Sequence, residues 1–230
     1  YNSLGETSWV PIAQKLKSAG ARAVAFVGVP EVLALLTKAM DEIGYRPDLI
    51  MADAGFYAEV LVERGGASVD GVVIRTAFTL LEEADRVKAV RDYVDMVNTH
   101  TTDGKISGLG MQAASASLLF ASAARDCIEA EGVLSRACVM EAAKSYTTWT
   151  GGGLHAPSQA GRGIPSPCYQ MITVKDGAFT RLYPPIEPTD ADRAIVDTVE
   201  ITADGWACDE STLVDLVGDY GDTTAGKRPS

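Results

Sequence analysis

Residues 23–31 read AVAFVGVPE. The first six form a short, continuous apolar run that ends at Gly28, and such a run predicts a strand buried on both faces of a sheet. Pro30 then stands where the first turn of a helix tolerates proline, and Glu31 favours a helix N-terminus. The stretch therefore predicts a buried strand that leads directly into a helix.

The same alternation continues on both sides of this stretch. The predicted elements are, in order, a helix over residues 9–19, the strand over 23–28, a helix over 30–43, a strand over 48–52, a helix over 56–63 and a strand over 71–76. Strands that alternate with helices are parallel and joined by right-handed crossovers. We therefore expect an α/β fold, with open parallel sheets and flanking helices.

After Phe78 the pattern changes to helices without intervening strands. Three helices are predicted over residues 82–98, 109–130 and 135–146, followed by a long loop over 147–167 that is rich in glycine, proline and serine. Two strands, 168–174 and 178–183, then form a hairpin whose turn contains Asp176 and Gly177. Trp9, Met40 and Phe120 lie on apolar helix faces, and we expect all three in the core.

The charge of the chain is uneven. Among 230 residues, 31 are acidic and 20 basic, for a net charge of −11, which disfavours nucleic acid as a partner. From residue 186 onward there are 11 acidic and three basic residues, so the tail carries most of this charge. Apolar side chains in the tail, among them Ile195, Val196 and Trp206, predict that it packs on the body.

Catalytic chemistry has little support in the sequence. Of the two histidines, His155 lies in WTGGGLHAP, residues 149–157, but we identify no nucleophile for it and no lysine of a phosphate loop. The cysteines lack zinc-site spacing. We therefore predict no catalytic residue, no metal and no cofactor. A hydrolase or transferase that uses His155 with Gly151, Gly152 and Gly153 is the alternative.

The four cysteines favour disulfides. Cys127 closes one predicted helix and Cys138 lies in the first turn of the next, so a bridge between them would staple a helical hairpin. Cys168 and Cys208 would then pair and tie the acidic tail to the hairpin strand. A fully paired set indicates an oxidising compartment. Four reduced, buried thiols in a cytosolic protein are the alternative.

Several of these features occur together in one order along the chain. They are GETSW at 5–9, KSAGARAVAFVG at 17–28, PE at 30–31, EIGYRP at 42–47, ADAG at 52–55, GVVIRTAF at 71–78, the alanine-rich helix from residue 112, WTGGG at 149–153 and VKDGAF at 174–179. This ordered set resembles the second half of the branched-chain amino-acid-type solute-binding proteins of ABC importers, which have the type I periplasmic binding fold. The resemblance covers about residues 1–184.

The resemblance implies a two-lobe architecture in which the first lobe is incomplete. Residues 1–77 would be most of the distal α/β lobe, 78–167 the hinge return and helices of the first lobe, 168–185 the hairpin and hinge strands, and 186–230 the tail. The chain begins at Tyr1, without methionine or a signal peptide, so we expect that a leader has been removed or that a preceding half is absent.

The resemblance also implies ligand-binding residues at the cleft. Gly28, Val29 and Glu31 match a family loop that lines the cleft, although Val29 replaces an aromatic residue of the amino-acid binders. Asp53 lies one position before the place of the acid that pairs with a ligand ammonium, and Ala54 occupies that place. The other expected contacts are Tyr57, Met111 and Gln112.

On this resemblance, we expect an extracytoplasmic component of an ABC importer that captures an amino acid or similar small organic solute without catalysis. Its partners would be the solute and the permease subunits, and it would be a monomer. It would reside in the periplasm or on the cell surface, with any lipid anchor in an N-terminal part outside this sequence. The ligand-sensing domain of a surface receptor, which shares the fold, is a further alternative.

Overall fold

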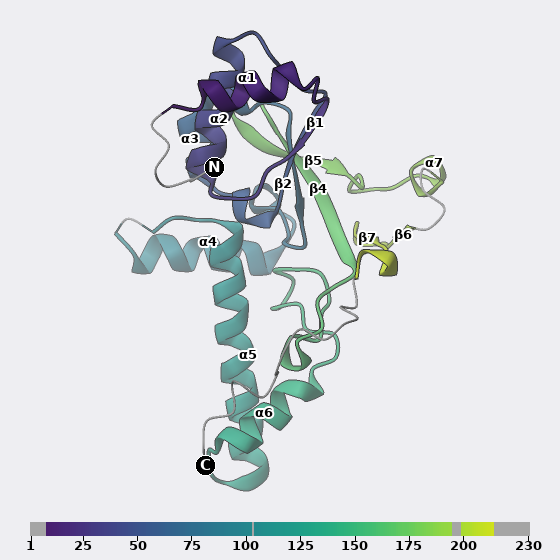
Figure 1. Cartoon of the computed structure of the whole chain (residues 1–230). Coiled ribbons are helices and arrows are strands. Elements are labelled where there is room, and N and C mark those ends of the chain that lie inside the picture. The colour runs from purple at the N-terminus through teal and green to yellow at the C-terminus, as the bar shows by residue number, and fades with distance from the viewer. Residues whose placement is uncertain (1–7, 103, 195–198, 214–230) are drawn as a thin grey trace, which may run out of the picture.

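The computed structural model describes residues 8–102, 104–194 and 199–213 and is built around one open sheet (Figure 1). The strands β1 (Ala23–Ala25), β2 (Leu49–Ala52) and β3 (Val72–Thr76) are parallel, in the order β1-β2-β3. This arrangement confirms the predicted α/β fold, with an open sheet and flanking helices.

The predicted hairpin joins the same sheet instead of standing apart from it. Strand β4 (Cys168–Lys175) pairs antiparallel with β3 and with β5 (Ala178–Tyr183). The turn between β4 and β5 places Asp176 and Gly177 at positive φ, 51° and 76°, as its Asp-Gly sequence predicts. The sheet is therefore mixed, with a parallel part and an antiparallel edge.

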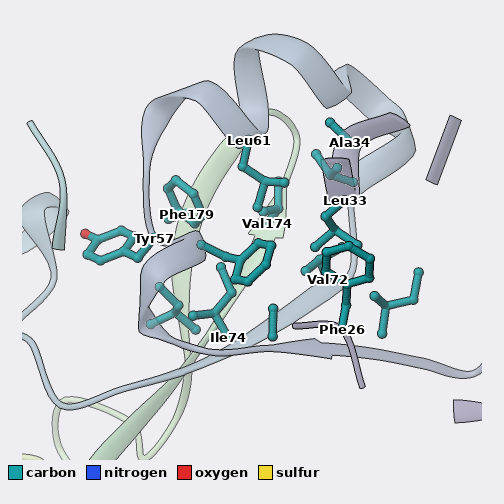
Figure 2. Packing of buried hydrophobic residues seen from close by; sticks show 14 of the residues in the cluster. Phe26, Leu33, Ala34, Tyr57, Leu61, Val72, Ile74, Val174 and Phe179 are labelled. Carbon is teal, nitrogen blue, oxygen red and sulfur yellow. The ribbon is translucent and has the colours of Figure 1, made fainter. Parts of the chain in front are cut away.

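The helices α1 (Val10–Ser18), α2 (Pro30–Glu42) and α3 (Glu59–Gly65) form a core with one face of this sheet. Proline stands at the start of α2, as expected, and Gly44 follows its end at φ 59°. Leu33, Leu61, Val72 and Ile74 are fully buried in this core (Figure 2). Trp9 and Met40 are buried as well, as predicted.

The expectation that the strand over residues 23–28 is buried on both faces is wrong, because Ala23 and Ala25 of β1 are exposed and Val24 is half-buried. Burial alternates along β2, where Ile50 and Ala52 are buried but Leu49 and Met51 are 38% and 37% exposed. The physical reason is that α1, α2 and α3 contribute to a core on one face only. Within the described ranges the opposite face of β1 and β2 keeps apolar side chains in contact with solvent.

The second part of the molecule is helical. It consists of α4 (Lys88–His100), α5 (Gly108–Glu131) and α6 (Arg136–Ser145), and α5 extends away from the sheet with α6 packed along it (Figure 1). Ser107 and Ser135 cap α5 and α6, and Gly132 ends α5 at φ 71°. Cys127 and Cys138 form the predicted bridge between α5 and α6.

Phe120 does not lie in the core, contrary to expectation. Its side chain is 61% exposed, and Leu118 and Met140 are also exposed on α5 and α6. Apolar periodicity identifies a face that favours burial, but α6 covers only part of the circumference of α5. Among the described residues no helix has the length and apolar character needed to cross a membrane.

The described part of the tail adds four short elements, which are α7 (Asp190–Arg193), β6 (Glu200–Ile201), β7 (Ala207–Cys208) and the 3₁₀ helix η5 (Glu210–Thr212). Trp206 is buried, and Cys208 forms the predicted disulfide with Cys168. Ile195 and Val196, which are predicted to pack on the body, lie outside the described residues, as do residues 1–7 and 214–230. The predicted domain boundaries stay predictions.

Candidate functional site

Two loops lie side by side at the carboxyl ends of β1 and β2, because these neighbouring strands are parallel. Gly28 and Val29 follow β1 and are exposed, and Val29 precedes the first residue of α2 in an extended conformation. Glu31 lies in the first turn of α2 and is half-buried. These three predicted residues therefore stand together at one edge of the sheet.

Asp53 directly follows β2 at the same edge. One of its carboxylate oxygens accepts a hydrogen bond from the Gly55 N–H at 2.7 Å, which starts the short 3₁₀ turn Ala54–Phe56. The residue nevertheless remains exposed. Asp53 can therefore hold this turn and still present a carboxylate to a ligand.

Tyr57 is buried in the core, unlike the exposed Asp53. It is 1% exposed, and its ring packs edge-on against Phe179 in the cluster of Figure 2. Its hydroxyl donates to Oε2 of Glu82 at 2.5 Å and accepts from the Leu81 N–H at 2.5 Å. Burial and the adjacent Glu82 carboxylate raise the pKa of Tyr57, so the phenol stays protonated. Tyr57 thus holds the segment after β3, and its contact with a ligand stays a prediction.

The start of α5 meets the loop after β2. The Gly108 N–H donates to the Tyr57 carbonyl at 3.0 Å, and Ala58 pairs with Ser107 in a β-bridge. A Cβ on Gly108 would stand 3.1 Å from the Phe78 ring and 3.4 Å from the Ala54 carbonyl oxygen, so this approach favours glycine. Elements about fifty residues apart in the sequence are joined at this point.

The two predicted ligand-binding residues of α5 differ in burial. Met111 is fully buried, whereas Gln112, one residue on, is exposed. The exposed members of the predicted set are Gly28, Val29, Asp53 and Gln112. We call these four residues the edge set.

The glycine-rich loop forms a turn beside the segment that follows β3. Gly151, Gly152 and Gly153 all have positive φ, 62°, 78° and 113°. The N–H groups of Gly153 and His155 both donate to the Thr150 carbonyl, so these two amides are already paired within the loop. Beyond the turn, His155 pairs with Phe78 in an antiparallel β-bridge. The loop therefore joins the return chain to the segment after β3.

His155 has a serine partner that sequence reasoning missed. Nε2 of His155 lies 2.7 Å from Oγ of Ser115, and Nδ1 lies 2.7 Å from the Ala156 carbonyl oxygen. Because a carbonyl can only accept, Nδ1 carries the proton and Nε2 accepts from the Ser115 hydroxyl. Burial lowers the pKa of His155, which favours this neutral form. Forty residues separate the pair, and no local motif marks it.

The Ser115–His155 pair has only part of what nucleophilic catalysis requires. Ser115 is buried in the first half of α5, and its Oγ also accepts the Trp149 Nε1–H at 2.9 Å. A backbone carbonyl occupies the position of the orienting carboxylate. The pair borders a cavity of about 520 Å³, which also contacts Phe120, Met140 and Trp149. The arrangement fits a hydrogen-bonded link between α5 and the loop.

Comparisons with known proteins agree with this architecture. A family model described as "Periplasmic binding protein" matches residues 1–178. A search among curated proteins gave no match.

Solved structures share the fold at low sequence identity. A branched-chain amino acid ABC transporter protein from Thermus thermophilus with bound valine superposes with a TM-score of 0.68 and 13% identity, over 83% of this chain and 52% of that one. The leucine binding protein LivK from Thermotoga maritima gives 0.59 and 20%, over 77% and 48%. A Rhodopseudomonas palustris protein, Rp1789, gives 0.63 and 17%, over 77% and 52%. The chain spans about half the length of these structures.

Proposed function

Because the chain belongs to the periplasmic binding protein family, we propose that it is part of an extracytoplasmic solute-binding protein that captures an amino acid or a similar small organic solute. The solute would be held in a cleft between two lobes and passed to the permease of an ABC importer. This membership bears out the resemblance seen in the residues. In this proposal the protein acts by binding and releasing the solute, without chemical conversion.

The observation that carries this proposal is the junction between the loop after β2 and the start of α5. The hydrogen bond from Gly108 to the Tyr57 carbonyl joins the sheet part to the helical part at the carboxyl edge of parallel strands. That edge is where open α/β sheets bind ligands. In this proposal the edge set supplies exposed groups from both parts, with Gly28, Val29 and Asp53 at that edge and Gln112 on α5.

The chemistry of the edge set suits an amino acid or an amine. Asp53 offers a carboxylate that would pair with an ammonium group, and the Gln112 amide offers both a donor and an acceptor. Val29 offers an apolar surface for a side chain. The Thermus thermophilus relative was solved with bound valine, so branched-chain amino acids are the first solutes to test.

Exposed apolar surfaces support the proposal that chain outside this sequence completes both lobes. Leu49 and Met51 lie uncovered on one face of the sheet, and Leu118 and Phe120 lie uncovered on α5. Parallel strands normally have both faces covered. This chain covers only about half of each structure that shares the fold, and the other half is long enough to cover both surfaces.

Titration calorimetry of the intact protein with L-leucine, L-valine, aromatic acids and short amides tests the proposal. The Asp53→Asn variant keeps an oxygen that can accept the Gly55 N–H but loses the charge. We expect it to bind an amino acid about 10- to 100-fold more weakly, because a charge-assisted hydrogen bond contributes about 1.5–3 kcal/mol. Asp95→Asn, which removes an exposed carboxylate from α4, is the matched control. Equal weakening by both variants would remove Asp53 from the site.

The Ser115–His155 pair favours a second candidate function, a hydrolase. If that function is correct, His155→Ala abolishes turnover of a chromogenic ester and leaves the affinity for solutes nearly unchanged. If the binding function is correct, wild-type protein binds a solute and releases it unmodified, as mass spectrometry of the recovered solute would establish. Turnover of the ester without binding of any solute would reject the proposal.

A further inference from the structure

The end of the described chain forms a small hairpin against the sheet. We call residues 199–213 the strap. Its strand β7 pairs antiparallel with the start of β4, where Cys168 faces Cys208 and Tyr169 faces Ala207, and β6 pairs with β7. The family match ends at residue 178, so the strap lies outside the matched region.

The strap is packed and not merely attached. The side chains of Val199, Ile201, Trp206 and Ala207 are all buried. Its turn depends on Gly205, which has φ 84° and donates its N–H to the Thr202 carbonyl. A residue with a side chain would be strained at this φ. The strap therefore holds one defined position on the sheet.

A buried ion pair connects the strap to the segment that leaves β3. Arg181 on β5 donates to the Gly205 carbonyl through Nη1 at 2.8 Å. Its Nε and Nη2 donate to the two carboxylate oxygens of Glu83 at 2.7 and 2.9 Å. The side chains of Arg181 and Glu83 are only 7% and 8% exposed. Separating them would leave a buried charge without its partner, so the three groups move together.

The strap is thus linked to both described passages of the chain between the sheet part and the helical part, to the first through Arg181 and to the second directly. Glu83 lies on the first passage, residues 77–87, between β3 and α4. The second passage, residues 146–167, joins α6 to β4. It ends at Pro167, whose carbonyl accepts the Asp209 N–H, and is followed by Cys168, the first residue of β4 and the partner of Cys208. A cavity of about 250 Å³ separates Asp204 and Trp206 of the strap from the glycine-rich loop, so these elements are not packed solidly together.

We propose that the strap is a tie across the hinge that limits the rotation of the two lobes, and that the Cys168–Cys208 disulfide is its covalent anchor. This inference rests on the proposed function, because it takes the two passages as the hinge of a solute-binding protein. The anchor keeps Gly205 against Arg181, and Arg181 keeps Glu83 and the first passage in place. Without the anchor, the strap can leave the sheet and the first passage gains freedom.

Hydrogen–deuterium exchange of the intact protein without solute tests the inference. The variant Cys168→Ser/Cys208→Ser removes the anchor, and Cys127→Ser/Cys138→Ser removes the other bridge as a matched control. We expect amides of residues 77–87 to exchange at least tenfold faster in the first variant and at the wild-type rate in the control. Equal protection of residues 77–87 in both variants would overturn the proposal.

A second measurement guards against loss of folding. In the Cys127→Ser/Cys138→Ser background, Cys168–Cys208 is the one bridge of this sequence that TCEP can reduce, so exchange before and after reduction is compared in the same variant. Faster exchange confined to residues 77–87 and the strap supports the proposal. Faster exchange over the whole chain overturns it, because the bridge would then support the entire fold. Failure of the proposed function is distinguishable, since it appears as absence of solute binding in calorimetry.

Discussion

The hydroxyl of Tyr57 lies 2.5 Å from Oε2 of Glu82 and ties the loop after β2 to the segment after β3. The same hydroxyl accepts the Leu81 N–H, so one side chain holds two groups of the first passage. This phenol positions the passage from inside the core. The predicted contact between Tyr57 and a solute would therefore require the segment after β3 to move.

Replacing Tyr57 by phenylalanine tests this positioning role. The variant keeps the ring against Phe179 but leaves the Leu81 N–H and the Glu82 carboxylate without this partner, so we expect the free energy of unfolding to fall by about 1–3 kcal/mol. Urea unfolding measures it. Tyr45→Phe, which removes a single hydrogen bond to the Ala21 carbonyl, is the control and should cost less. An equal or larger loss in the control would contradict the positioning role.

Alanine at Gly151 should be more damaging than alanine at Gly152. Both glycines have positive φ, which costs an alanine about 1–2 kcal/mol at either site. A Cβ on Gly151 would also stand 2.6 Å from Oγ of Ser115, whereas a Cβ on Gly152 would meet only the Ala89 side chain at 3.8 Å. We expect a further loss of about 1–3 kcal/mol for Gly151→Ala in urea unfolding. Equal losses would mean that the contact with Ser115 does not constrain the loop.

Glu83→Gln should destabilise the protein strongly, because it leaves the Arg181 guanidinium buried without its countercharge. Removing one partner of a buried ion pair costs about 3–5 kcal/mol. The exposed pair of Lys88 and Asp92 provides the control, and Asp92→Asn should cost at most about 1 kcal/mol. Chemical denaturation of both variants compares the two pairs directly. A loss for Glu83→Gln within the range of the control would show that the buried pair does not hold the strap junction.

Sequence periodicity predicted most of the fold, because strand and helix boundaries depend on local patterns that glycine and proline punctuate. The disulfides could also be predicted from the sequence. Cys127 and Cys138 lie at the facing ends of two consecutive predicted helices, and their pairing leaves Cys168 and Cys208 to pair with each other. Exposure was harder to predict. The pattern around Phe120 and Met51 identifies faces that favour burial, but it does not say which element covers them.

The site was predictable only in part, for a related reason. Residues such as Val29 and Asp53 follow directly from strands, so the topology places them at one edge. The partners of His155 and Glu83 come from positions 40 and 98 residues away, and no local spacing encodes such pairs. The resemblance places Tyr57 among the expected ligand contacts, but its burial depends on packing against Phe179 from the distant hairpin.

His155 should make the stability of the protein sensitive to acid. Burial lowers its pKa below the usual 6.5, so the folded state binds a proton less readily than the unfolded state. The stabilising contribution is therefore fully present above about pH 6.5 and is lost as the pH falls through the lowered pKa of the folded state. We expect the melting temperature of the wild type to fall from pH 8 to pH 5 more steeply than that of His155→Gln, whose side chain does not titrate.

The difference between the two proteins isolates His155 from other groups, including Glu82, whose pKa is raised by burial and which acts in the opposite direction. If the melting temperatures of the two proteins fall equally between pH 8 and pH 5, His155 does not need to be neutral to bind Ser115.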